Sequence, residues 1–173
     1  MKYKLFLIIV ISLLLSGCTL FQQQNPTDVS PNVPTNNQPS SSEEKPITNK
    51  NILDLSNQQL TKVPEYVFNQ TNLQELNLSN NQLTGAIQAE IRHLQNLKVL
   101  NASNNLMTGV PAEIGQLQNL QILDLSNNQL TGLPYELGNL KNLKTLNISG
   151  NNYSTLDLNI IKEKLPANVN IIK

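Results

Sequence analysis

The chain has 173 residues, of which 14% are charged and 4% aromatic, and its 12 basic and 12 acidic side chains give a formal net charge of zero. A nucleic-acid-binding domain needs a basic surface, so this balance argues against a nucleic-acid partner. The single cysteine excludes an internal disulfide.

Residues 1–17 have the pattern of a signal peptide. Lys2 and Lys4 precede an apolar run, Leu5 to Leu15, which is shorter than the about 20 residues that span a bilayer. The sequence Leu15-Ser16-Gly17-Cys18 resembles a bacterial lipobox. This resemblance implies cleavage before Cys18, a diacylglycerol on its thiol and usually an acyl chain such as palmitate on the new amine. Two or three chains make a firm anchor.

The lipobox implies a lipoprotein held by its lipid in the cell membrane or the outer membrane, facing the periplasm or the exterior. An ordinary signal peptide with an incidental cysteine is the alternative. The position of the only cysteine at the motif favours the lipobox. Residues 18–46 then form a segment rich in Pro, Ser, Asn and Gln. Such a composition cannot offset its ordering entropy, which predicts a disordered linker.

Residues 47–173 consist of a repeat of 23 or 24 residues. Each unit carries two apolar residues separated by a polar one, the pattern of a short strand with one buried face. These pairs are Leu53/Leu55, Leu76/Leu78, Leu100/Ala102, Leu123/Leu125, Leu146/Ile148 and Val169/Ile171. A period of this length indicates a solenoid, in which each unit buries its apolar residues against its neighbours.

Within each unit, an amide side chain follows the second apolar residue by three positions. It is Gln58 in the first unit and Asn81, Asn105, Asn128 and Asn151 in the later ones. An amide has both donors and acceptors, so a ladder of these residues is expected to satisfy buried loop backbone groups. The return limb, with Pro134, Leu137 and Leu140 in one unit, has an approximately helical spacing.

The pattern LxxLxLxxNxL is complete in Leu73 to Leu83 and in Leu120 to Leu130. It resembles the leucine-rich repeat family. The resemblance implies an α/β repeat solenoid, a right-handed superhelix with a parallel concave β-sheet of about six short strands. It does not specify a ligand. One extra residue in Thr84 to Gln88 should be absorbed locally, and the last unit should contain a helix that ends before Pro166.

The titratable residues of the repeats do not suggest an enzyme. His93 has no second histidine or cysteine to share a metal, and no histidine joins the recurrent serines in a catalytic arrangement. A phosphate-binding glycine loop is also absent from the sequence. We therefore expect no catalytic residue, no metal, no cofactor and no small-molecule substrate.

The outward side chains of the strands form two columns, and these are the candidate partner contacts. The polar column is Asp54, Asn77, Asn101, Asp124 and Asn147, with Asn170 expected to extend it. The variable column is Ile52, Glu75, Val99, Ile122 and Thr145. The polar column matches the repeat consensus and suits close strands, whereas exposed apolar residues that vary are free to suit a partner.

The sequence favours a lipid-anchored protein of the cell envelope whose solenoid binds a protein partner without catalysis. Two alternatives stay open. One is a structural or self-associating envelope protein without a specific ligand, and the other is an accessory subunit of an enzyme encoded elsewhere.

Overall fold

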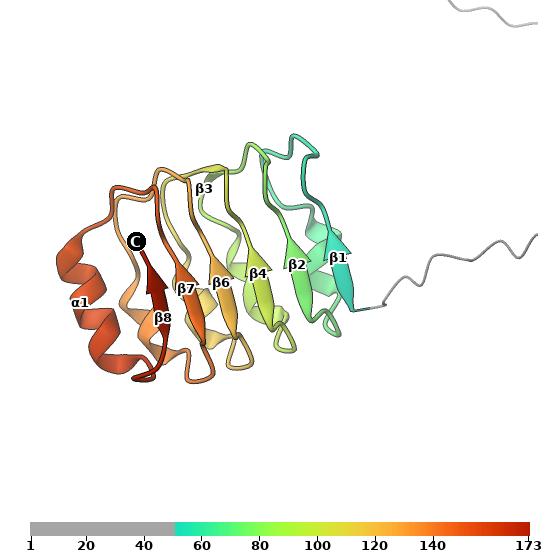
Figure 1. Ribbon diagram of the computed structural model, residues 1–173. Helices are drawn as coiled ribbons and strands as arrows, with labels where there is room; N and C mark the ends of the chain where they lie inside the picture. The colour runs from blue at the N-terminus through green and yellow to red at the C-terminus, as the bar shows by residue number, and fades with distance from the viewer. Residues whose placement is uncertain (1–50) are drawn as a thin grey trace, which may run out of the picture. The chain divides into compact units, whose positions relative to one another are not determined.

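Six short parallel strands organise residues 51–173, the part of the chain that the computed structural model describes (Figure 1). The strands are β1 (Ile52–Asp54), β2 (Glu75–Asn77), β4 (Val99–Asn101), β6 (Ile122–Asp124), β7 (Thr145–Asn147) and β8 (Asn170–Ile172). They form one sheet in chain order, β1-β2-β4-β6-β7-β8. The predicted solenoid with a parallel sheet of about six strands is confirmed.

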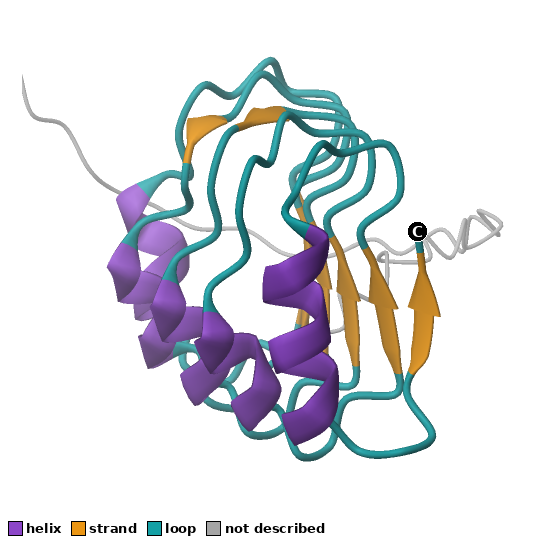
Figure 2. Cartoon of the chain, turned by 90° about the vertical axis from the view of Figure 1, so that its left-hand side faces the viewer, coloured by secondary structure: helices purple, strands orange, loops and turns teal. Residues whose placement is uncertain are grey.

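The return limbs place helices on the side of the solenoid opposite the strands (Figure 2). Four limbs contain a 3-10 helix: η1 (Glu65–Asn69), η2 (Ala89–His93), η3 (Ala112–Gln116) and η4 (Tyr135–Asn139). Pro64, Pro111 and Pro134 are the N-caps of η1, η3 and η4, and Gln88 is that of η2. Proline suits such a place because no helical hydrogen bond is lost there. Gln88 instead donates its side-chain amide to the Val63 carbonyl at 2.6 Å.

The core fills the space between the sheet and the helices. Leu76, Leu100, Leu123 and Leu146 are in register across four neighbouring strands and almost completely buried. No unit could bury both its strand and its return limb alone, so stacking supplies the apolar environment.

The predicted amide ladder is confirmed for its four asparagines, whereas Gln58, its predicted first member, is exposed. The Asn128 amide nitrogen donates to the carbonyl oxygens of Leu125 and, one repeat earlier, Ala102, at 3.0 Å each. Its oxygen accepts the Met107 N–H at 3.0 Å. Asn81, Asn105 and Asn151 make the equivalent bonds. Within residues 51–173, every buried side-chain nitrogen or oxygen has a partner.

The extra residue of the second unit is absorbed outside the main sheet, as expected. There, β3 (Thr84–Gly85) pairs with β5 (Leu106–Met107) in a two-stranded sheet. Gly85 has a φ of +67°, a conformation that suits glycine. The main sheet is unaffected, because Leu76 still pairs with Leu100.

The predicted register of the last strand is wrong by two residues. Leu146 pairs with Ile171, not with Val169, so Asn170 lies beside Thr145 and Ile172 lies beside Asn147. The cause is the last return limb, where α1 (Thr155–Lys164), an α-helix of 10 residues, replaces the five-residue 3-10 helix. Asn170 therefore extends the variable column, and Ile172 ends the polar one. The expected end of the helix before Pro166 is confirmed.

The signal peptide, Cys18 and the linker to residue 46 lie outside the described residues. Within residues 51–173, none of the helices combines the length and the apolar character needed to cross a bilayer.

Candidate functional site

The ten predicted contact residues lie on one face of the sheet, which we call the open face. Parallel pairing aligns Ile52, Glu75, Val99, Ile122 and Thr145 in one column. It aligns Asp54, Asn77, Asn101, Asp124 and Asn147 in the other. The helices lie on the other side of the solenoid (Figure 2). The structure thus brings the predicted residues together as two parallel columns.

The polar column is committed to the fold. In β1, β2, β4, β6 and β7 its side-chain oxygen accepts the N–H two residues further on, as Asp124 does from Ser126 at 2.9 Å. The Ser126 hydroxyl also donates to Asp124 at 2.6 Å. The Asn147 amide donates across the strands to the second Asp124 oxygen at 3.1 Å. These bonds turn the chain away from the sheet, so the structure gives this column a structural role.

Asp54 begins the polar column and is ionised at neutral pH. The backbone N–H of Ser56 lowers the pKa of this carboxyl below its ordinary value, and the Ser56 hydroxyl and the Asn77 side chain act in the same direction. Desolvation opposes them only in part. The Ser56 N–H lies 2.9 Å from the Asp54 Oδ1 atom. A negative charge is therefore fixed at the β1 end of the open face.

The variable column has no such structural commitment. Ile52 and Ile122 are 46% and 40% exposed, Glu75 is exposed, and Val99 and Thr145 are half-buried. Val99 pairs directly with Ile122 across β4 and β6. Neighbouring parallel strands are about 4.8 Å apart, so these two side chains form one apolar patch. Exposed apolar area of this kind marks contact surfaces more often than isolated surface residues do.

The open face is hollowed over β1, β2 and β4. This hollow has a volume of about 280 Å³ and is lined by Ile52, Asp54, Glu75, Leu76, Asn77, Val99 and Asn101. Six of these seven residues belong to the predicted contact set. The remaining predicted residues, on β6 and β7, continue the two columns beyond the hollow. The sequence predicts the positions of the two columns but not the hollow over β1, β2 and β4.

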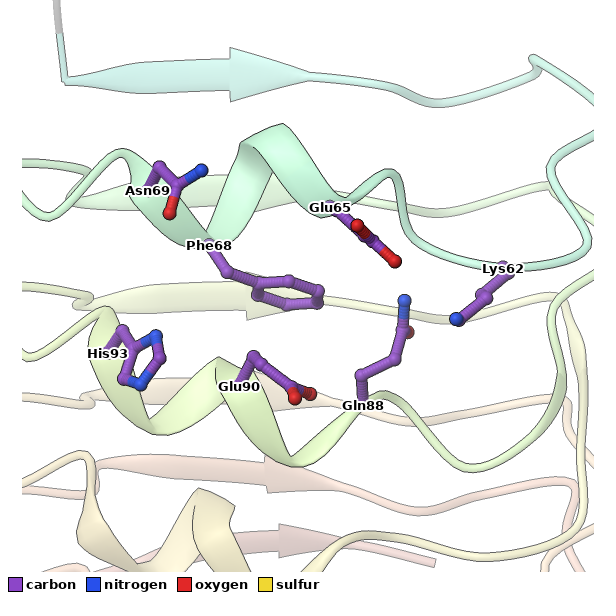
Figure 3. Close-up of a pocket in the computed structure, with 7 residues that line it drawn as sticks. All are labelled: Lys62, Glu65, Phe68, Asn69, Gln88, Glu90 and His93. Atoms are coloured by element: carbon purple, nitrogen blue, oxygen red, sulfur yellow. The ribbon is translucent and has the colours of Figure 1, made fainter.

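A second concavity, between η1 and η2, was not predicted. It has a volume of about 310 Å³ and is lined by Lys62, Glu65, Phe68, Asn69, Gln88, Glu90 and His93 (Figure 3). At the repeat position that carries Gly115 in η3 and Gly138 in η4, η1 carries Phe68, whose side chain lies between η1 and η2 and lines the groove (Figure 3). This glycine pattern in the sequence was the signal that could have located the groove.

His93 lies at the edge of the groove between η1 and η2. His93 is exposed and lines the groove together with Glu65 and Glu90, without a second histidine or a cysteine. Across residues 51–173, no group of three His, Cys, Asp or Glu side chains is placed to hold a metal ion.

Comparison with known families agrees with the repeat geometry. Family models described as leucine rich repeats match residues 51–107, 95–135 and 118–163. No curated protein matches the chain.

Solved structures share the architecture over part of their length. A leucine-rich repeat protein of Leptospira interrogans is 42% identical over 66% of this chain and 29% of its own, with a TM-score of 0.62. The ectodomain of the receptor kinase SOBIR1 from Arabidopsis thaliana is 31% identical over 70% of this chain and 67% of its own, with a TM-score of 0.56. The plant peptide hormone receptor RGFR1, in complex with RGF2, is 31% identical over 64% of this chain and 18% of its own, with a TM-score of 0.53. The chain spans less than a third of the Leptospira protein.

Proposed function

We propose that this chain, which belongs to the leucine-rich repeat family, binds a protein or peptide partner on its open face and is held in the cell envelope by a lipid on Cys18. Binding here means surface complementarity without catalysis. The solved plant receptor complex gives a related example, because that receptor is in complex with RGF2.

One observation carries the binding proposal. On a single face, one column of side chains is occupied by hydrogen bonds that maintain the fold, and the column beside it exposes Ile52 and Ile122 without any such bond. Interface cores favour apolar anchors surrounded by polar groups, and a few residues usually dominate the affinity. The arrangement of Val99 and Ile122 beside Asn101 and Asp124 has this composition.

A photo-crosslinking experiment tests where the partner binds. A benzophenone amino acid is placed at Val99 in the full chain, in its native cells, and a matched control carries it at Gln116, which is exposed on η3. We expect a covalent adduct with a second protein at position 99 and none at position 116. An adduct confined to position 116, or an adduct at position 99 made only with another copy of this chain, contradicts the proposal.

The anchoring proposal rests on the lipobox-like sequence around Cys18 and is tested separately. Replacement of Cys18 by alanine should abolish metabolic labelling with an alkyne-bearing palmitate, because the acceptor thiol and the cleavage site are lost together. Gln23→Ala, outside the motif, should keep the label. Mass spectrometry that finds unmodified Cys18 in the mature protein contradicts the anchor.

A further inference from the structure

All the charged side chains in the two columns of the open face are acidic. The columns contain twelve residues when β8 is included, and among them Asp54, Glu75 and Asp124 are charged whereas none is basic. The whole chain, by contrast, has equal numbers of acidic and basic residues. Lys98 and Lys144 come directly before β4 and β7, and the Lys98 ammonium donates to the Gln74 side chain at 2.9 Å. These lysines therefore flank the strand ends and do not line the hollow.

The hollow combines three kinds of lining group. Asp54 and Glu75 supply carboxylates from neighbouring strands, Asn77 and Asn101 supply side-chain amides, and Ile52 and Val99 supply apolar surface. The Asp54 carboxylate accepts the Ser56 N–H at 2.9 Å, and the Ser56 hydroxyl and the Asn77 side chain also stabilise its charged form. A carboxylate can accept about four hydrogen bonds, so Asp54 retains capacity for a further donor.

We propose that this hollow receives an arginine side chain from an extended basic segment of the partner. Arginine matches each kind of lining group. Its guanidinium offers five donors in a plane for the carboxylate oxygens of Asp54 and Glu75, and its aliphatic stem suits contact with apolar residues such as Ile52 and Val99. A carboxylate-bearing or purely apolar side chain would leave the Asp54 and Glu75 charges without a partner, which is costly once water is excluded.

The position of the apolar patch adds a spacing to this inference. Ile122 lies on β6, two strands beyond β2 in the middle of the hollow. Two strand spacings amount to about 9.6 Å, or about three extended residues at about 3.3 Å each. Side chains on one face of an extended segment lie two or four positions apart, so the partner segment should carry an apolar residue two or four positions from its arginine. This inference rests on the proposed function and specifies the chemistry of its partner.

Peptide selection tests the chemistry of the hollow directly. The full-length mature protein, in detergent micelles, is used to select from a phage library of random dodecapeptides. We expect enrichment of arginine with an apolar residue two or four positions away, on the same face of the extended peptide. A selected peptide should bind at least tenfold more weakly when its arginine is replaced by citrulline, which has a similar shape but no charge.

Paired variants assign the effect to the hollow. Asp54→Asn with Glu75→Gln should weaken the selected peptide at least tenfold and reduce the salt dependence of its binding. Glu136→Gln with Glu163→Gln removes two exposed carboxylates on η4 and α1 and should leave binding unchanged.

The outcomes separate this inference from the function on which it rests. The arginine inference is overturned if no peptide is enriched or if the enriched peptides lack a basic residue. It is also overturned if either the citrulline replacement or the pair of changes at Asp54 and Glu75 leaves binding unchanged. If the selected peptides no longer bind the double variant Val99→Asp with Ile122→Lys, the open face remains the binding face. Peptides that are insensitive to that pair contradict the proposed function itself.

Discussion

The helix side of this solenoid is closely packed between neighbouring repeats, whereas the open face exposes side chains to solvent. On the helix side, glycine permits close stacking: a Cβ atom on Gly115 would lie 2.7 Å from the Glu136 carbonyl carbon, and one on Gly138 would lie 2.7 Å from the Lys164 Cβ atom. On the open face, the variable column projects Ile52 and Ile122 with much of their surface exposed. The fold depends on the close stacking of the helices and leaves the variable column of the open face free to vary.

This difference assigns stability and binding to separate residues. Substitutions in the interior and between the stacked helices should lower the free energy of unfolding and affect binding only through it. Substitutions in the variable column should weaken binding and leave the free energy of unfolding nearly unchanged. In a repeat protein each unit contacts only its neighbours, so a local change can be compared with its counterpart in another unit.

The largest loss of stability is expected for Leu125→Ala, in the interior that both surfaces share. Leu125 is completely buried, and the cavity left behind should cost about 2–5 kcal/mol of the free energy of unfolding. Chemical denaturation followed by circular dichroism measures it. A loss below about 1 kcal/mol would show that the core collapses around the deleted atoms, against the tight packing of the interior.

A smaller loss is expected where the helices stack. Gly115→Ala should cost about 3 kcal/mol, because the added methyl group meets the backbone of η4 and forces it to move. Gly109→Ala is the control, since its nearest neighbour, the Ala86 Cβ atom, lies 4.0 Å away. Equal denaturation midpoints for the two variants would contradict the account of close stacking.

Removal of one asparagine from the ladder should lower the free energy of unfolding by about 2 kcal/mol. Asn128→Ala leaves the Met107 N–H and the Ala102 carbonyl without a bond that they have in the native protein. Asn152→Ala, at an exposed position outside the ladder, should change the midpoint little. If both variants unfold alike, the ladder does not stabilise the loops.

Sequence periodicity was sufficient for most of the fold because each unit closes with the same short limb. The strand pairs predict the register correctly from Leu53 to Leu146. Prediction failed at β8, where α1 lengthens the last unit and shifts the register to Ile171. A constant period contains no information about a limb of different helical type.

Other features depend on neighbours that the period does not specify. Asn80, Asn104 and Asn127 have positive φ angles, and Gly150 takes the same position and conformation in the last unit. Asparagine and glycine tolerate this region best, so their recurrence was a usable signal. For the site, alternation in each strand predicted both columns. The hollow over β1, β2 and β4 could not be predicted, because its depth depends on side-chain packing across strands.

The most direct measurement compares binding and stability in two matched pairs of variants. One pair, Val99→Asp with Ile122→Lys, places charge on adjacent strands of the open face. The other, Gln116→Asp with Asn139→Lys, places the same charges on exposed residues at the ends of η3 and η4. Both pairs should change the free energy of unfolding by under about 1 kcal/mol.

Affinity for the partner identified by crosslinking, measured by titration calorimetry, then distinguishes the two surfaces. The open-face pair should weaken binding about a thousandfold, since the loss of a dominant interface anchor costs at least about 2 kcal/mol and two anchors are removed. The helix-side pair should leave the affinity within about twofold of the unmodified protein, as expected for residues outside the contact. Loss of binding in the helix-side pair with full affinity in the open-face pair would contradict the central claim.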